Sequence, residues 1–314
     1  MLFIFSILTL FLCHIYGSFV INNLKTNNIS SVNIKIVSPN FDLKYNLNEN
    51  EIEDLLVKLT KYSEPDKNKK TLFVWPEGVF TGFDVMTIAK NKQIIKDKFS
   101  KNHIIIFGVN TLNQKTGFYN NSLIAINNEF EIIYQYNKKK LVPFGEFLPF
   151  EKYLKKTGFK KITQGYSSFS AGNKEQKNLI FDNLNILPLI CYEVIFPELV
   201  QNAKLNTNLI INISEDAWFG GSIGPHQHFA KAIFRAIESN TYVVRSANQG
   251  ISAFIDNRGK VIKSLEPNET GNIELNIPFI NSKFKNRNDL IFFILLFTYT
   301  IIFFTLRNKL NDKK

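Results

Sequence analysis

The chain has 314 residues, of which 45% are hydrophobic and 21% are charged, and these proportions exclude an intrinsically disordered protein. Its formal net charge of +11 comes from lysines scattered along the chain, without an arginine-rich arm, so the composition argues against nucleic-acid binding. Attraction to an anionic membrane surface agrees better with this charge and with the apolar ends of the chain.

The first element is an apolar run, residues 2–21, which contains 20 residues and no Lys, Arg, Asp or Glu. A helix of about 20 apolar residues is long enough to cross a bilayer. A cleaved signal peptide is the alternative, but no basic residue precedes the run and no small-x-small cleavage site is evident. We therefore expect residues 1–24 to form an N-terminal membrane anchor.

Residues 25–285 alternate between strand and helix patterns, which predicts a single α/β domain made of layers of sheet and helix. Leucine and isoleucine spaced by three and four residues predict a helix over residues 51–59, and a second helix is predicted over 228–239. Apolar or β-branched runs predict the strands. The predicted strands are 32–38, 71–75, 103–109, 118–126, 131–136, 186–190, 208–213, 242–246, 251–255 and 260–265.

The pattern is interrupted over residues 141–177, a stretch that contains several Pro and Gly residues. A loop of this length in a compact domain is usually functional. We therefore interpret it as a lid or a binding loop.

The last element is a second apolar run, residues 290–306, with 17 uncharged residues. This length is the short limit for a membrane span, and a buried core helix is disfavoured because the run has no polar face. Basic residues after the run favour a cytoplasmic C-terminus. We expect a transmembrane helix at 288–307, a cytoplasmic tail at 308–314, and the domain between the two spans on the other side of the membrane.

The two cysteines lie in different surroundings. Cys13 lies in the first apolar run, so Cys191 is the only cysteine of residues 25–285, and no disulfide is expected there. A lone cysteine is usually a small buried apolar residue, but it can also be a free nucleophile, and its neighbours decide between the two.

Three reactive side chains directly follow predicted strands: Glu77, Lys138 and Cys191. The carboxyl ends of strands carry the ligand crevice in open α/β sheets. A carboxylate could take the thiol proton and an ammonium could stabilise an oxyanion, which would make a nucleophilic site. Each residue also has a structural interpretation, as a surface glutamate, a lysine in a solvated turn or a buried cysteine, and spacing alone does not bring the three together.

Several motifs resemble the nitrilase superfamily of carbon–nitrogen hydrolases, and within it the apolipoprotein N-acyltransferases. The similar stretches are Trp75–Glu77, Tyr136–Glu146, Cys191–Glu193, Asp216–Gly220, Gly224–His228 and Arg245–Gly250.

The resemblance implies a nitrilase-like α-β-β-α sandwich, here flanked by an N-terminal and a C-terminal transmembrane helix. It implies a bacterial inner-membrane enzyme whose catalytic domain faces the periplasm. Such an enzyme transfers a fatty acyl chain from a phospholipid donor to the N-terminal amine of an apolipoprotein acceptor, without a cofactor.

The resemblance also implies roles for individual residues of this chain. Cys191 would form a thioester, Glu77 would be the general base, and Lys138 would stabilise the tetrahedral intermediate. A second group would support the site or contact substrate. The supporting residues are Glu146, Tyr192 and Glu193, and the substrate-binding residues are Trp75, Trp218 and Phe219.

Two departures from the family pattern leave alternatives open. The family carries several spans before its catalytic domain, whereas this sequence has room for one, so the chain could be a fragment, could start at a misplaced methionine, or could be a truly short form. The non-enzymatic alternative is a degenerate or truncated, inactive domain that serves as a membrane-tethered binding module. Glu215 stands where an Asn or a small polar residue is expected. A second enzymatic alternative is a carbon–nitrogen hydrolase that uses the same three residues to cleave a small amide or nitrile.

A metal site is the remaining alternative. His226 and His228, near Glu215 and Asp216, could suggest one, but histidines two residues apart do not share a helical face. We therefore expect no metal, and we expect these histidines to cap or position the following helix. Trp218 and Phe219 could equally be core residues, and Arg235 and Glu238 are expected to form a structural pair.

Overall fold

The structure, a computed structural model, describes residues 2–22, 31–44, 48–80, 82–150, 168–173, 175–201, 207–278 and 289–311. The chain divides into two compact units, one comprising Met1–Thr26 with Lys285–Lys314, and the other Asn27–Phe284. Much of the predicted loop at 141–177 lies outside the described residues, because 151–167 and 174 are not among them.

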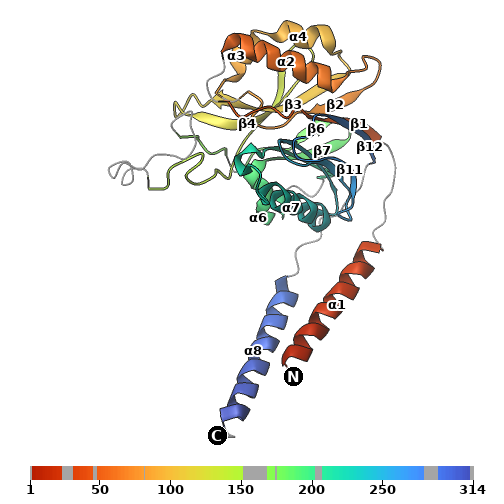
Figure 1. The fold of residues 1–314 in the computed structure, drawn as a ribbon, viewed down its shortest axis with the longest axis vertical. Coiled ribbons are helices and arrows are strands. Elements are labelled where there is room, and N and C mark those ends of the chain that lie inside the picture. Colours follow the sequence, from red (N-terminus) through yellow and green to blue (C-terminus); the bar gives the residue numbers. More distant parts are fainter. Residues whose placement is uncertain are drawn as a thin grey trace. The chain divides into compact units, whose positions relative to one another are not determined.

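The larger unit contains two six-stranded mixed sheets (Figure 1). The first sheet has the order β12 (Gly271–Pro278), β1 (Ser31–Ser38), β2 (Thr71–Val74), β3 (His103–Leu112), β4 (Tyr119–Ile126) and β5 (Ile132–Asn137). The second sheet has the order β11 (Val261–Leu265), β10 (Ser252–Ile255), β9 (Tyr242–Asn248), β8 (Leu209–Glu215), β7 (Leu184–Ile190) and β6 (Leu179–Phe181). Strands β1 to β3 run parallel to one another, as do β7 to β9.

Helices cover the outer face of each sheet (Figure 1). On the first sheet they are α2 (Glu49–Ser63), α3 (Val85–Ala89) and α4 (Lys92–Lys98), and on the second they are α6 (Pro197–Gln201) and α7 (Gly224–Ser239). Short 3₁₀ helices, η2 (Cys191–Ile195) and η3 (Ala217–Phe219), follow β7 and β8. The layers are therefore helix, sheet, sheet and helix, which confirms the predicted α-β-β-α sandwich of the body.

Three apolar cores separate these layers, and the alternation of side chains along each strand fills them. In β2, Leu72 and Val74 enter the core between the two sheets, whereas Phe73 enters the core beneath α2 to α4. The third core lies between the second sheet and the helices α6 and α7. Strands buried on both faces explain why β2 and β8 appear in the sequence as nearly continuous apolar runs.

Helix α2 shows how local sequence sets an element of this fold. Asn48 caps its first turn in a capping box, because the Asn48 side chain accepts from the Glu51 amide and the Glu51 carboxylate accepts from the Asn48 amide. Ile52, Leu56 and Leu59 then occupy one fully buried face of the helix. This face matches the spacing from which the helix was predicted.

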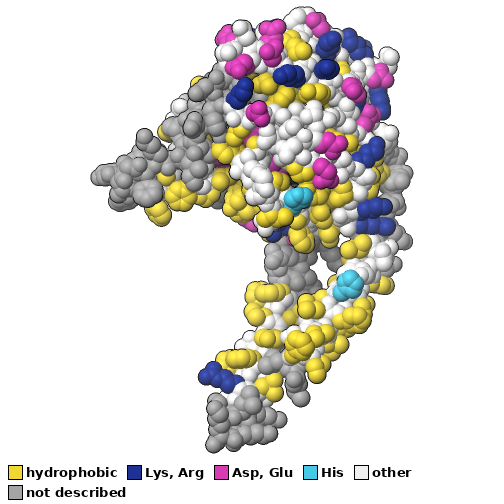
Figure 2. Space-filling view, viewed as in Figure 1, with side chains coloured by type: hydrophobic (Ala, Val, Ile, Leu, Met, Phe, Trp, Pro, Cys, Tyr) yellow, Lys and Arg dark blue, Asp and Glu magenta, His cyan; other side chains and the backbone are white. Residues whose placement is uncertain are grey.

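The smaller unit contains α1 (Leu2–Asn22) and α8 (Asp289–Asn311), which confirms helices at both predicted runs. Within α1, Phe3–Asn22 has the length and composition of a membrane span, but the apolar part of α8, Phe292–Asn308, is shorter. The side chains visible on these helices are mainly hydrophobic (Figure 2). The expectation of two transmembrane helices is therefore supported by length and composition for α1 only, since α8 has fewer consecutive apolar residues.

Candidate active site

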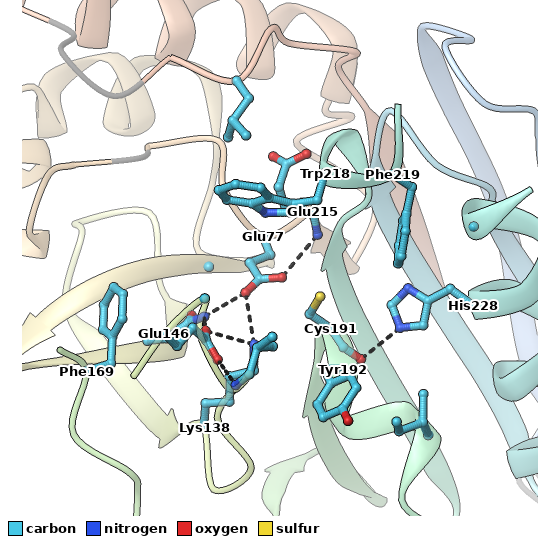
Figure 3. Close-up of a pocket in the computed structure, with 18 of the residues that line it drawn as sticks. Glu77, Lys138, Glu146, Phe169, Cys191, Tyr192, Glu215, Trp218, Phe219 and His228 are labelled. Atoms are coloured by element: carbon cyan, nitrogen blue, oxygen red, sulfur yellow. Dashed lines mark hydrogen bonds and ion pairs between the residues drawn. The ribbon is translucent and has the colours of Figure 1, made fainter. Parts of the chain in front are cut away.

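The strand ends of both sheets meet at one cavity of about 590 Å³. Glu77 lies shortly after the end of β2, in the stretch Trp75-Pro76-Glu77. Lys138 directly follows β5, and Cys191 directly follows β7. All three side chains line the cavity (Figure 3). The structure therefore brings together the three residues that the sequence marked separately.

Cys191 occupies a sharp turn between strand β7 and the 3₁₀ helix η2. Its backbone φ is +50°, a conformation that residues other than glycine rarely adopt. Such a strand-to-helix turn projects the side chain of its central residue into the cleft. Cys191 is a free cysteine, its residue is partly exposed and it lines the cavity, so a substrate in the cavity can reach it.

The Glu77 carboxylate is held by hydrogen bonds to both of its oxygens. Oε1 accepts from Asn121 Nδ2 at 2.7 Å, and Oε2 accepts from the backbone amide of Glu215 at 3.0 Å. One donor comes from each sheet, since Asn121 is in β4 and Glu215 ends β8. The carboxylate is thereby fixed at the junction of the two sheets (Figure 3).

The Lys138 ammonium lies between two carboxylates. Its Nζ is 2.9 Å from Glu146 Oε1 and 3.6 Å from Glu77 Oε1, and its side chain is only 1% exposed. Burial by itself disfavours the charged form, but Glu146 and Glu77 outweigh burial and raise the pKa of Lys138 above its usual value. Lys138 therefore stays protonated and acts as a fixed positive charge, not as a proton donor.

Burial and the neighbouring Glu77 raise the pKa of the Cys191 thiol, and this effect exceeds the opposing influence of Lys138. The resting thiol is therefore protonated at neutral pH. A thiolate is the reactive nucleophile, so a base has to remove the proton when substrate binds. Three glutamates line the cavity with the thiol, Glu77, Glu146 and Glu215, and among them Glu77 is the one whose charge raises the pKa of the thiol.

The predicted supporting residues have distinct positions. Glu146 accepts from Lys138 and Asn121 through Oε1 and from the Val142 amide through Oε2, so it orients the ammonium and its own loop. Tyr192 lines the cavity and packs edge-on against Phe196 at 5.0 Å between ring centroids.

Glu193 is fully buried and connects the turn at Cys191 to the loop that carries Lys138. Its carboxylate accepts from the backbone amides of Ile190, Lys139 and Lys140, at distances of 2.9, 2.7 and 3.1 Å, and from the Tyr136 hydroxyl. Burial raises the pKa of Glu193, against these hydrogen bonds. Because its donors are backbone amides on both sides of the site, its geometry fits a role in fixing the distance between the two reactive groups.

Two of the three predicted substrate contacts lie at the cavity and one does not. Trp218 and Phe219, in η3, line the cavity and are 47% and 39% exposed. Trp75 is fully buried in the core beneath α2, where its indole nitrogen donates to Ser63 Oγ at 2.9 Å. The structure therefore corrects the expectation for Trp75, because its side chain shares the helix-facing side of the sheet with Phe73.

We expect Trp75→Phe to lower the free energy of unfolding by about 2–3 kcal/mol, since it leaves a cavity and removes the hydrogen bond from the indole to Ser63, whose hydroxyl still donates to the Leu59 carbonyl. The KM for substrate should change less than twofold. Denaturant titration and steady-state kinetics on the same protein check this. A raised KM with unchanged stability would restore Trp75 as a substrate contact.

A second polar cluster contains Asp216 and His228, two of the residues that the sequence suggested as possible metal ligands. Asp216 forms an ion pair with Arg245 (Oδ2 to Nη2, 2.7 Å) and its Oδ1 lies 3.0 Å from His228 Nδ1, whereas His226 is exposed on α7. Within the described residues, no group of three or more His, Cys, Asp or Glu side chains is arranged to hold a metal ion. Arg235 and Glu238 form the expected pair, at 2.8 Å.

Asn121 is a site residue that the sequence did not indicate. Its side-chain Nδ2 donates to both Glu77 and Glu146 at 2.7 Å, and its backbone carbonyl accepts from the Lys138 backbone amide at 2.8 Å. It is a polar residue in the middle of a strand pattern, flanked by polar neighbours, and only the pairing of β4 with β5 places it beside Lys138. Assigning the register between the predicted strands 118–126 and 131–136 would have placed Asn121 beside Lys138.

Glu215 is a second carboxyl beside the base and has no cationic partner in the described ion pairs. Its Oε1 accepts from the Ala217 amide at 3.0 Å and its Oε2 from Asn248 Nδ2 at 2.9 Å, and its residue is 3% exposed. Burial raises its pKa from 4.5 to about 8, although the hydrogen bond from Asn248 opposes this. Between pH 4.5 and about 8, Glu215 is therefore protonated in the folded protein and ionised in the unfolded chain.

This pKa predicts a measurable pH dependence of stability. Because the folded pKa of Glu215 exceeds the unfolded one, its stabilising contribution is complete below pH 4.5 and is lost as the pH rises to about 8. We expect the melting temperature to fall less between pH 5 and 8 for Glu215→Gln than for the unchanged protein. Both proteins are measured in the same detergent. Equal slopes would show that Glu215 titrates at an ordinary value.

Comparison with known proteins places these residues in a family context. The family model of the carbon–nitrogen hydrolases matches residues 32–280. The chain is 34% identical over 251 residues to an apolipoprotein N-acyltransferase of Allorhizobium ampelinum, covering 76% of this chain and 47% of that protein. It is 33% identical over 311 residues to the protein of the same name from Rickettsia typhi, covering 94% of this chain and 61% of that one.

Among solved structures, an amidase of the nitrilase superfamily from Nesterenkonia AN1 is similar in fold, with a TM-score of 0.56. The two chains are 16% identical, and the match covers 85% of this chain and 97% of the amidase. At this identity the similarity concerns the fold alone. The chain spans 47% to 61% of the length of the two N-acyltransferase relatives.

Proposed function

Because the chain belongs to the carbon–nitrogen hydrolase family, we propose that it is an N-acyltransferase that carries a fatty acyl group on Cys191. One observation supports this most: Glu77, Lys138 and Cys191 line a single cavity. The other walls of this cavity are largely apolar and would accept an acyl chain; they include Leu43, Phe80, Val109, Val142, Phe169 and Ile195.

In the first half-reaction, the Cys191 sulfur attacks the ester carbonyl of a phospholipid while Glu77 takes the thiol proton. The Lys138 ammonium stabilises the oxyanion of the tetrahedral intermediate. A C–S bond forms and the ester C–O bond breaks. The leaving alkoxide takes the proton back from Glu77 and departs as a lysophospholipid alcohol.

In the second half-reaction, the amine of the acceptor attacks the thioester carbonyl and Glu77 takes a proton from the amine. A C–N bond forms, the C–S bond breaks, and the thiolate takes the proton from Glu77. The thiolate is a good leaving group, so two easier steps replace one difficult transfer. Lys138 serves both steps unchanged because its raised pKa keeps it protonated.

The proposed donor is a phospholipid and the proposed acceptor is the N-terminal diacylglyceryl-cysteine of an apolipoprotein, by analogy with the relatives. Residues 25–285 would be the catalytic domain on the periplasmic side of a bacterial inner membrane. Residues 1–24 and 288–307 would be its anchors, and 308–314 a cytoplasmic tail. The composition of α1 supports the first of these anchors.

A transfer assay tests the proposal. The full chain in detergent is mixed with a diacylglyceryl-cysteine peptide and phosphatidylethanolamine that carries deuterated acyl chains. We expect mass spectrometry to show an amide-linked deuterated chain on the peptide. Release of ammonia from small amides without lipid would favour the hydrolase alternative, and a chain that neither transfers nor hydrolyses would be the inactive binding module.

A further inference from the structure

A buried polar network lies next to Cys191. It consists of Ser214, Asp216, His228 and Arg245, none more than 6% exposed. Figure 3 shows His228 across Cys191 from the Glu77 carboxylate. The acyl-transfer steps above use none of these side chains.

Two members of the network lie next to Cys191, one at its backbone carbonyl and one beside its side chain. His228 Nε2 lies 3.2 Å from the Cys191 carbonyl oxygen. Ile190 of β7 pairs with Ile213 of β8, which places Ser214 beside Cys191, and Ser214 lowers the pKa of the Cys191 thiol against the effect of burial. The backbone of Cys191 is thus held from α7, and a serine hydroxyl at the end of β8 lies beside its side chain.

Asp216 connects Ser214 to Arg245, which in turn reaches His228. Its Oδ1 accepts from Ser214 Oγ at 2.7 Å and lies 3.0 Å from His228 Nδ1, and its Oδ2 accepts from Arg245 at 2.7 Å. Arg245 is fully buried and also donates to Asn212 of the neighbouring strand β8, which fixes the position of its guanidinium. Arg245 and the hydrogen bonds hold the pKa of Asp216 below its usual range although burial opposes this, so Asp216 is a permanent acceptor.

The proton positions follow from the partners. A carbonyl oxygen only accepts, so His228 Nε2 carries a proton and donates it to Cys191. Burial and Arg245 lower the pKa of His228, against the influence of Asp216 and of the Cys191 carbonyl. In the neutral ring, Nδ1 accepts from the Arg245 guanidinium at 3.1 Å, and Asp216 acts on the ring through Arg245. The ring is therefore a hydrogen-bond donor to the turn, and Phe219 packs against it at 5.6 Å between centroids.

We infer that Ser214, Asp216 and His228 are positioning residues for the nucleophile, with Ser214 donating to the Cys191 thiolate and His228 holding the backbone turn. The inference rests on the proposed role of Cys191. Ser214 has one hydroxyl proton, which points to Asp216 while the thiol is protonated. When Glu77 removes the thiol proton, the hydroxyl proton turns to the sulfur, and Asp216 keeps its bond from Arg245.

Alkylation of Cys191 by iodoacetamide tests Ser214 without any acyl-transfer substrate. The full chain carries Cys13→Ser, so that Cys191 is the only thiol, and intact mass follows the rate from pH 6 to 11. We expect Ser214→Ala to move the midpoint of the rate profile upward by about one pH unit, the value of one hydrogen bond to a charged group.

Ser246→Ala is the matched control, because Ser246 is an equally buried serine on the adjacent strand β9 and donates to the Val37 carbonyl, outside the network. Its midpoint should stay within 0.2 pH units, about the precision of such a profile. An equal shift in both variants, or no shift in Ser214→Ala, would overturn the role of Ser214 even if acyl transfer itself were absent.

A pair of variants tests His228. In His228→Gln the amide nitrogen can reach the position of Nε2 and keep the donor, whereas His228→Leu removes it at similar volume. We expect kcat for acyl transfer to fall about 10- to 100-fold in the Leu variant with KM within twofold, and to fall less than about fivefold in the Gln variant. Equal loss in both, at equal thermal stability, would show that His228 only fills space.

Discussion

Replacing Cys191 with serine is expected to lower the rate of acyl transfer by at least about 10⁴-fold, the largest effect of any single substitution in this chain. The serine hydroxyl has nearly the same size as the thiol, so the turn at φ +50° and its hydrogen bond from His228 should persist. A hydroxyl is a far weaker nucleophile, and Glu77 alone would have to remove a much less acidic proton.

Initial rates with the deuterated phospholipid measure this loss, and circular dichroism checks the fold. Cys13→Ser is the matched control, since Cys13 lies exposed on α1 and should be replaceable without loss of rate. Activity of Cys191→Ser above a tenth of the unchanged protein would refute the thioester mechanism.

Replacing Glu77 with glutamine is expected to lower the rate of thioester formation by about 10²- to 10⁴-fold, the usual contribution of a general base. The amide keeps the shape of the carboxylate and one acceptor for Asn121 or the Glu215 amide. Lys138 keeps Glu146 as a partner at 2.9 Å, so no buried charge is left unpaired and the fold should survive.

Single-turnover mixing with phospholipid, followed by acid quench and mass measurement, separates thioester formation from later steps. Glu53→Gln, on the exposed face of α2, is the control and should leave the rate unchanged. If Glu77→Gln formed the thioester at an unchanged rate but failed to transfer it, Glu77 would act only on the amine.

The strands of this fold could be predicted where burial on both faces produced apolar runs, as in β2, β7 and β8. Strand β12 (Gly271–Pro278) was missed because its residues are mostly half-buried and alternate with polar side chains, and its place beside β1 depends on a pairing across most of the chain. Strand β6 has only three residues, too few for a pattern.

The reactive residues could be predicted because each one follows a strand, and strand ends converge. The residues that orient them could not, since Asn121 and Ser214 are ordinary polar residues inside strands and only register brings them to Lys138 and Cys191. Trp75 was misjudged from its place in a motif, although the alternation along the strand puts it with Phe73 on the helix-facing side.

The most direct test of the account is the intact mass of the detergent-purified full chain after incubation with phospholipid. We predict one added fatty acyl group that maps to Cys191, is removed by hydroxylamine, and is absent from Cys191→Ser. A Cys191 thiol that reacts with iodoacetamide but takes up no acyl group from any phospholipid would contradict the central claim that this chain is an acyltransferase acting through Cys191.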